Sequence, residues 1–345
     1  MTTTREARNQ PLELDDEMSA IAYCYQQGWT DGLPVVPPTT ALVDEMLEAS
    51  GEDPESILAT HTTTGRHCSA HSAAVNSVMA GCLPEYFPIV AAALRAMSHR
   101  EYNYHGSTAS TGGAAPLVIV SGPIVDAIGM NSGVNTFGSG NRPNATIGRA
   151  IRLVHLNVFK MVPGVTDRST QGNPGKYSLC IAENSQANPW ASLVEESGFP
   201  SGSSCVTVYA ASAFHNIENH YSSEGDGVLM TIADSMASLG SLTHGQSVVV
   251  LSPEHASIVA QNGRTKLQVQ EFLFAHAQRP IEELRKVGKG GKAKEEQFHR
   301  GLSPDDILVT VAGGEAGGHS AFLPSWSRMR GSVMQTEIIK PISKD

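Results

Sequence analysis

The clearest buried strand of the chain is Pro116-Leu-Val-Ile-Val-Ser-Gly122, an apolar and largely β-branched run that ends at a Gly-Pro pair. A run without polar alternation is typical of a strand that is covered on both faces. Similar runs lie at 247–251 and 306–312, and helical patterns separate them. This alternation predicts an α/β fold with mixed or mostly parallel sheets flanked by helices, arranged as two α/β lobes.

Working outward from these strands, apolar periodicity and turn residues predict the other elements. The expected helices are 14–28 (capped by Asp15 or Asp16), 40–50, 68–82, 87–98, 145–159, 226–238, 253–261 and 265–277, with further strands at 177–183 and 204–210. We expect three parts: an N-terminal helical arm with a Pro-rich loop (1–50), an α/β domain that carries the motifs (51–210), and a C-terminal α/β domain with a Gly-rich loop (211–345).

Composition limits the classes of function. Of 345 residues, 40% are hydrophobic and 17% charged, which is enough apolar material for a core. The net charge of −10, without a basic stripe, argues against a nucleic-acid partner. No apolar run approaches the roughly 18 residues of a membrane span, so we expect no membrane partner. Five widely spaced cysteines without a CxxC pair favour reduced thiols and a cytoplasmic location.

A metal site is one hypothesis, carried by Arg66-His-Cys-Ser-Ala-His71. If this segment is helical, His67 and His71 lie at i and i+4 on one face, with Cys68 nearby. Imidazoles suit Zn, Cu, Fe or Ni. His105, Cys82, His61 and Glu85 are candidates for the remaining ligands. The alternative is that these are partly exposed histidines with no ligand.

Two further segments carry candidate catalytic residues. The loop at 102–113, just before the first strand, holds His105 among hydroxyls and glycines, and we expect His105 to act as general acid/base or ligand. The segment 171–184 brings Lys176 and Glu183 into one neighbourhood, where a buried amine and carboxylate would suit proton transfer. A structural Lys–Glu pair is the alternative interpretation.

A loop rich in asparagine precedes the helix predicted at 145–159. Side-chain amides and the free N–H groups of a helix start are suited to holding a carboxylate. The predicted substrate-binding residues are Asn131, Ser132, Asn141, Arg142, Asn144 and Arg149. Such loops can also use asparagine only to form left-handed corners. The Walker and Rossmann glycine patterns are absent.

Three features have weaker interpretations. Cys82, Cys180 or Cys205 would be the nucleophile if the chemistry depends on a thiol, although buried unreactive cysteine is the commoner outcome. The glycine-rich turn 313–319 follows a buried strand and either binds an anion or acts as a hinge. The basic stretch 285–295 reads as a mobile surface loop, with a lid as the alternative.

Several of these stretches resemble a large bacterial family found alongside the UGSC (seleno)proteins. The matching motifs are DGLPVVPPT at 31–39, NSVMAGCLPEY at 76–86, APLVIVSGP at 115–123, IGMNSG at 128–133, GNRPNATIGR at 140–149, GNPGKY at 172–177 and CIAEN at 180–184. The resemblance covers most of 29–210 and implies an enzyme-like protein, with a thiol or selenol redox protein as a partner. It departs at 66–71 and at Gly112-Gly113, where the family carries other residues.

These observations together predict an enzyme of the lyase type. We expect metal- or histidine-assisted bond cleavage or elimination on a small, polar, carboxylate-bearing substrate, with a transition metal as the only cofactor. A cysteine-dependent redox or nucleophilic enzyme is the first alternative, and a non-catalytic binding subunit of a larger complex is the second. We also expect a homo-oligomer.

Overall fold

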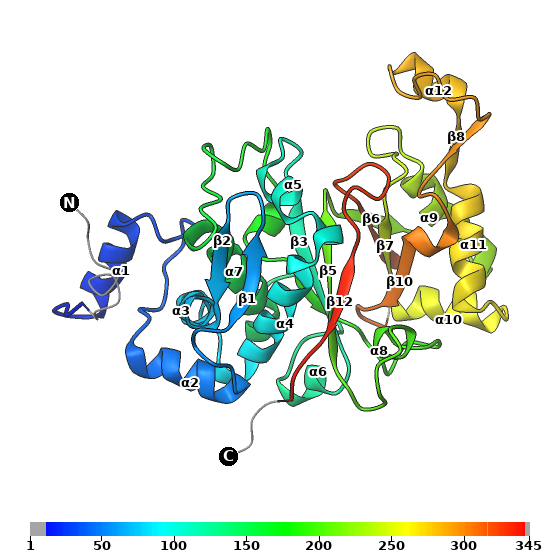
Figure 1. Cartoon of the computed structure of the whole chain (residues 1–345). Helices are drawn as coiled ribbons and strands as arrows, with labels where there is room; N and C mark the ends of the chain where they lie inside the picture. The colour runs from blue at the N-terminus through cyan, green and yellow to red at the C-terminus, as the bar shows by residue number, and fades with distance from the viewer. Residues whose placement is uncertain (1–11, 316, 342–345) are drawn as a thin grey trace.

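The computed structural model describes residues 12–315 and 317–341, and its main elements form four layers (Figure 1). Helices cover the outer face of one four-stranded sheet, a second four-stranded sheet packs on its inner face, and further helices cover the second sheet. The α/β prediction is confirmed.

The first sheet has the order β12-β5-β3-β4. Its strands are β3 (Ala115–Ser121), β4 (Cys180–Ala182), β5 (Cys205–Ala211) and β12 (Gln335–Ile338). β3 runs parallel to β4 and antiparallel to β5, and β12 is antiparallel to β5. The outer face carries α2 (Thr40–Ser50), α3 (Ala70–Ala80), α4 (Phe87–Ser98) and α7 (Arg142–Asn157).

The second sheet has the order β10-β7-β11-β6. Its strands are β6 (His215–Glu218), β7 (Ser247–Leu251), β10 (Ile307–Val311) and β11 (His319–Pro324), and only β7 and β10 are parallel. Helices α9 (Gly225–Met236), α10 (Pro253–Gln261) and α11 (Lys266–His276) cover its outer face. Both sheets are therefore mixed, and the mostly parallel alternative is wrong. β12, from the predicted C-terminal part, belongs to the first sheet.

The run at 116–121 owes its uninterrupted apolar character to this layering. Val118 and Val120 pack in the core beneath the outer helices, whereas Leu117 and Ile119 pack in the core between the sheets. All seven residues of β3 are buried, as the pattern predicts for a strand covered on both faces.

Smaller elements complete the chain. Two β-hairpins are formed by β1 (Ile57–His61) with β2 (Arg66–Ser69), and by β8 (Gln278–Pro280) with β9 (Gln297–His299). The short helices are α1 (Glu17–Gln26), α5 (Tyr104–Ala109), α6 (Ile124–Ala127), α8 (Leu193–Glu196) and α12 (Ile281–Lys286). Part of the predicted basic loop is thus helical, because α12 ends within it.

Candidate functional site

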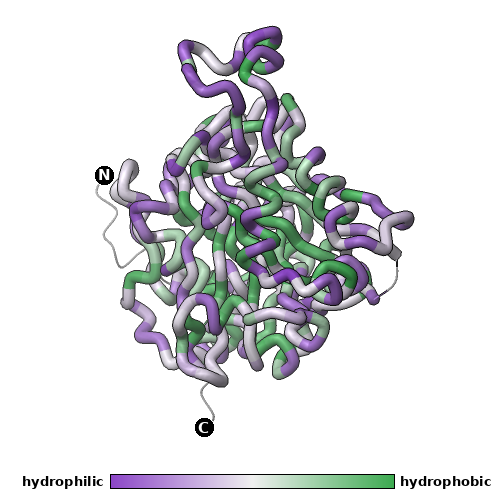
Figure 2. The backbone as a smooth tube through the Cα atoms, turned by 90° about the vertical axis from the view of Figure 1, so that its right-hand side faces the viewer, coloured by the Kyte–Doolittle hydropathy of each residue, from purple (hydrophilic) through white to green (hydrophobic). Residues whose placement is uncertain are grey.

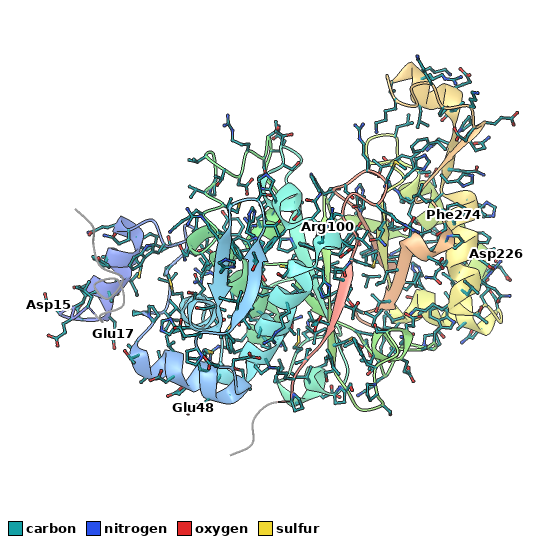
Figure 3. All side chains as sticks on the ribbon, in the orientation of Figure 1. Asp15, Glu17, Glu48, Arg100, Asp226 and Phe274 are labelled. Atoms are coloured by element: carbon teal, nitrogen blue, oxygen red, sulfur yellow. The ribbon has the colours of Figure 1, made fainter. Side chains whose placement is uncertain are left out.

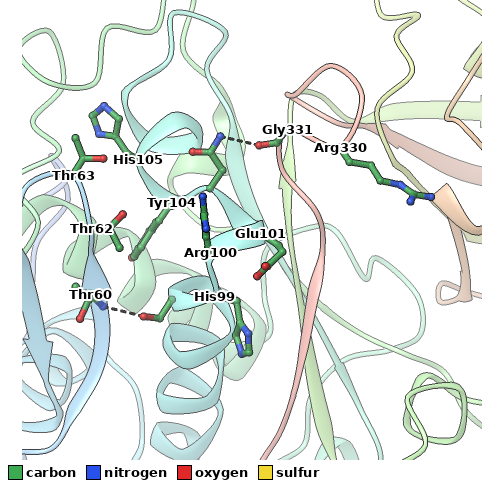
Figure 4. A pocket seen from close by; sticks show the side chains of 12 residues that line it. Thr60, Thr62, Thr63, His99, Arg100, Glu101, Tyr104, His105, Arg330 and Gly331 are labelled. Atoms are coloured by element: carbon green, nitrogen blue, oxygen red, sulfur yellow. Dashed lines mark hydrogen bonds between the residues drawn. The ribbon is translucent and has the colours of Figure 1, made fainter.

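Two open cavities lie on the side of the first sheet that carries α7. The first, of about 420 Å³, is bounded by the β1–β2 turn, the start of α5 and the 330–331 turn. Figure 4 shows Tyr104 and His105 reaching it from α5, opposite Thr62 and Thr63. Asn103 closes one side by donating to the Gly331 carbonyl at 2.7 Å. We call it the hairpin cavity.

The second cavity, about 550 Å³, lies where the 161–177 loop folds against α7 and the Pro-rich loop. We call it the α7 cavity. The charged residues on its wall are Asp31, Arg152, Asp167 and Lys176, and its neutral polar residues are Thr30, Ser169, Thr170, Gln171, Asn173 and Tyr177. Its volume is in the range of small-molecule sites in proteins.

An amine, a carboxylate and a hydroxyl are in mutual contact on this wall. Lys176 Nζ donates to Asp167 Oδ2 at 2.5 Å and to Ser169 Oγ at 2.6 Å. The Ser169 hydroxyl in turn donates to Asp167 Oδ1 at 2.5 Å. The side chains of Asp167 and Lys176 are only 4% and 14% exposed, so this triad is held largely away from bulk water.

Burial sets the acid–base behaviour of the pair. It lowers the pKa of Lys176 below its ordinary value, and the hydrogen bond to Asp167 offsets only part of this effect. Burial alone would raise the pKa of Asp167, but hydrogen bonds from Lys176 and Ser169 outweigh it and the pKa is lowered. The pair therefore combines a firmly ionised carboxylate with an amine that releases its proton more readily than an exposed lysine.

Arg152 supplies the second cation of the α7 cavity. Its Nε donates to the Lys176 carbonyl at 3.1 Å and its NH1 to His155 Nδ1 at 2.9 Å. Its NH2 is 3.7 Å from Asp167 Oδ2 and makes no hydrogen bond to any described residue. The guanidinium is thus fixed by two bonds and keeps one donor group for a ligand.

The predicted pair of Lys176 with Glu183 is wrong, because Glu183 faces the space between the sheets. Its carboxylate accepts hydrogen bonds from the Ser121 hydroxyl, from Leu193 N at 3.0 Å and from Thr310 Oγ1 at 3.2 Å. The partner of Lys176 is Asp167, which no sequence motif indicated. We assign Glu183 a structural role.

The side-chain amides of the asparagine-rich loop form hydrogen bonds with the backbone of the same loop. The Asn144 side chain bonds the backbone of Asn131 twice at 2.9 Å, because its Oδ1 accepts from Asn131 N and its Nδ2 donates to the Asn131 carbonyl. Asn141 caps α7 by accepting from Asn144 N. Ser132 accepts from Gly313 N through its carbonyl. None of these residues lines either cavity, so the structure favours the alternative interpretation, a self-bonded corner.

The two arginines predicted to bind substrate, Arg142 and Arg149, instead form hydrogen bonds within the protein. Arg142 Nε donates to the Gly81 carbonyl at 3.0 Å. Arg149 holds Asp31 with two bonds of 2.9 and 2.8 Å and donates to the Pro34 carbonyl. Arg149 therefore fastens the Pro-rich loop to α7. The arginine at the cavity wall is instead Arg152, one helical turn further on.

The predicted helical histidine pair does not form, because residues 66–69 are a strand and α3 begins only at Ala70. His67 is exposed on β2 and Cys68 is buried on the opposite face, since neighbouring strand residues alternate. His71 lies on α3, capped by Ser69. Among the described residues, no three His, Cys, Asp or Glu side chains converge closely enough to hold one metal ion.

His105 is the one predicted histidine that reaches a cavity, and it leads into a buried cluster. Its ring centroid is 5.2 Å from that of His61, and Tyr104 links His61 to His155 at 5.7 and 5.1 Å. Four buried polar atoms of this cluster have no partner in the described part of the chain: His61 Nε2, Tyr104 Oη, His105 Nδ1 and His155 Nε2. Burial, reinforced by Arg152, lowers the pKa of His155 well below its usual value.

All five cysteines are free and buried. Burial raises the pKa of Cys68, Cys82 and Cys205 to about 12, and it also raises the pKa of Cys24 and Cys180. A thiol attacks as its thiolate, so none of these environments activates a nucleophile.

Sequence reasoning missed Arg152, His155, Asp167 and Ser169. A signal existed for the first two, because they interrupt the otherwise apolar stretch 150–156 on the helix predicted at 145–159. No periodic pattern marks Asp167 and Ser169, which lie in an irregular loop.

Comparison with known proteins adds no assignment: no family model matches the chain, and no curated protein matches it. Within 12–315 and 317–341, every helix is too short or too polar to cross a bilayer.

Proposed function

We propose that the chain is an enzyme that cleaves a bond in a small polar compound bearing a carboxylate, and that the α7 cavity is its active site. The observation that carries this proposal is the contact of Lys176 with both Asp167 and Ser169 at the wall of the cavity, beside a guanidinium with a free donor group.

Charge supports a carboxylate as the ligand. Asp31 is neutralised by Arg149, and Asp167 by Lys176. Arg152 remains as the cation whose NH2 has no hydrogen bond to a described residue. Arginine binds carboxylates well because its planar N–H groups match their geometry.

Lys176 is suited to move the proton. Because burial lowers its pKa, the Lys176 ammonium gives up a proton more readily than an exposed lysine, and the neutral amine can then accept a proton from the carbon next to the bound carboxylate. The C–H electron pair then forms a double bond, the leaving group departs with its own bonding pair, and Asp167 stabilises the new ammonium group. Arg152 holds the carboxylate as negative charge develops on it.

Deuterium exchange tests this proposal without knowledge of the product. Wild type is incubated in D₂O with a panel of small hydroxy-, amino- and unsaturated carboxylic acids and with a cell extract, and NMR and mass spectrometry follow deuterium gain and loss of substrate. We expect at least one carboxylate to react, Lys176→Met to abolish the reaction, and the exposed Lys160→Met to leave it unchanged. A compound that binds without exchange or conversion would instead favour the binding-subunit alternative.

A further inference from the structure

The N-terminal arm, residues 12–36, presents an unusual amount of apolar surface. Only Cys24 of α1 is buried. Leu12, Leu14, Met18, Tyr25, Trp29, Leu33 and Val36 are all at least 38% exposed. Single exposed apolar residues are ordinary, but seven within one segment of 25 residues point to an interaction surface.

The same arm begins with a block of negative charge. Residues 12–18 contain Glu13, Asp15, Asp16 and Glu17 and no cation. Asp16 caps α1, whereas the other three form no ion pair with a described residue. Figure 3 shows Asp15 and Glu17 at the outer edge of the molecule, with their side chains directed away from the protein body.

A second projection carries the opposite charge. The hairpin of β8 and β9, with α12 at its tip, stands away from the body and is largely hydrophilic (Figures 1 and 2). Residues 285–294 contain five cations and no carboxylate. Lys286, Lys292 and Lys294 are exposed and have no ion-pair partner among the described residues, and Val287 between them is 52% exposed. We call residues 285–294 of this projection the basic arm.

The two arms cannot meet within one chain, because α1 and α12 lie at opposite ends of the molecule (Figure 1). We propose that they meet between two copies: the N-terminal arm of each copy docks on the basic arm of the other. A two-fold axis makes both contacts at once and closes the assembly as a dimer.

Charge and apolar area contribute differently to this contact. Two copies of a chain with a net charge of −10 repel each other overall. The basic arm is positively charged, so it attracts the acidic N-terminal arm of the second copy. The apolar residues of the N-terminal arm supply burial that does not depend on salt. We therefore expect a dimer that weakens in salt without disappearing completely.

Analytical ultracentrifugation of the full chain tests the proposal. The protein concentration is varied up to about 100 µM, in about 0.05 M and in about 1 M salt. We expect wild type to sediment at twice its 36.6 kDa mass in low salt and to bind about tenfold more weakly in high salt. The triple variant Lys286→Glu, Lys292→Glu, Lys294→Glu, and equally Glu13→Lys, Asp15→Lys, Glu17→Lys, should weaken the dimer about a hundredfold.

A charge swap separates a specific contact from general charge effects. The chain that carries both triple changes restores complementarity and should dimerise again, whereas Asp44→Lys, Glu45→Lys, Glu48→Lys on α2 should leave dimerisation as it is. A wild type that stays monomeric, an oligomer indifferent to both triple variants, or open-ended polymers in place of a dimer would each overturn the proposal. Circular dichroism confirms that each variant is folded.

Discussion

Arg152 donates a hydrogen bond to Nδ1 of His155 at 2.9 Å, in the buried layer behind the α7 cavity. An arginine can only donate, so Nδ1 is the acceptor and neutral His155 carries its hydrogen on Nε2. A protonated His155 would face the guanidinium with a second positive charge. The hydrogen bond that fixes Arg152 to His155 therefore requires a neutral His155.

This relationship predicts how stability depends on pH. Burial keeps His155 neutral in the folded protein well below its usual pKa, whereas the unfolded chain takes up a proton below about pH 6.5. The unfolded state then binds more protons, so the free energy of unfolding falls as pH drops below about 6.5, by up to about 1.4 kcal/mol per pH unit for one group. We expect His155→Gln to remove this part of the slope in urea titrations between about pH 5 and 6.5.

The control for this measurement is His67→Gln, because His67 is exposed on β2. His61, His215 and His255 also have lowered pKa values through burial, so the wild-type slope exceeds the contribution of one histidine. An unchanged slope in His155→Gln would mean that His155 is protonated in the folded protein.

Asp167 should control the ionisation of Lys176. Replacing it by asparagine removes the negative charge that favours the ammonium form, so the pKa of Lys176 should fall further below its ordinary value. An NMR titration that follows the Lys176 Cε signal measures this directly. Ser169→Ala removes a neutral partner and should shift the titration less than Asp167→Asn. Equal shifts in the two variants would contradict the assignment of Asp167 as the charge partner.

How far the fold could be predicted depended on whether its signals are local. Helices α2 and α4 and strand β7 begin and end where their patterns predict, and Gly51 ends α2 in the left-handed conformation. Strands β6 and β12 were missed because they are short and partly polar, and because their partners lie far away in the sequence. The first two residues of the helix predicted at 68–82 are strand instead, because β2 pairs with β1 and α3 begins at Ala70.

In the candidate site, too, only the features with a local sequence signal could be predicted. Lys176 was predicted, since its Gly- and Pro-rich turn is visible in the sequence, but its partner was not. Whether Asp167 or Glu183 meets Lys176 depends on how the 161–173 loop folds onto α7, and no periodic pattern encodes that path. The asparagine-rich loop was predicted to bind substrate because an amide that caps the backbone and an amide that binds a ligand look the same in a sequence.

The ion pair of Arg149 with Asp31 should contribute to stability rather than to chemistry. Its side chains are 16% and 13% exposed, so Asp31→Asn leaves a mostly buried guanidinium without its counter-charge. We expect this change to lower the free energy of unfolding by about 2–4 kcal/mol. The exposed pair Arg285–Glu282 is the matched control, and Glu282→Gln should cost less than about 0.5 kcal/mol. Similar losses in both variants would show that Asp31 is not a buried anchor.

Thiol reagents should find no reactive cysteine in the folded chain. Since burial raises the pKa of Cys68, Cys82 and Cys205 to about 12, the thiolate fraction at about pH 8 is roughly one in ten thousand. Iodoacetamide followed by peptide mass spectrometry should label the native protein slowly and all five cysteines after unfolding. One cysteine labelled rapidly in the native state would revive the cysteine-dependent alternative.

Two buried tyrosines offer a direct test of the cluster around His61. The Tyr209 hydroxyl lies 2.9 Å from the Gln246 carbonyl and 3.2 Å from the Leu323 carbonyl, whereas the Tyr104 hydroxyl has no partner among the described residues. Because an unpaired buried hydroxyl costs free energy, Tyr104→Phe should leave stability unchanged or raise it by about 1 kcal/mol, while Tyr209→Phe should lower it by about 1–2 kcal/mol. Urea unfolding at about pH 7.5 compares the two while keeping the histidines neutral. If Tyr104→Phe proved as costly as Tyr209→Phe, the Tyr104 hydroxyl would have to bond a group such as an ordered water between the rings.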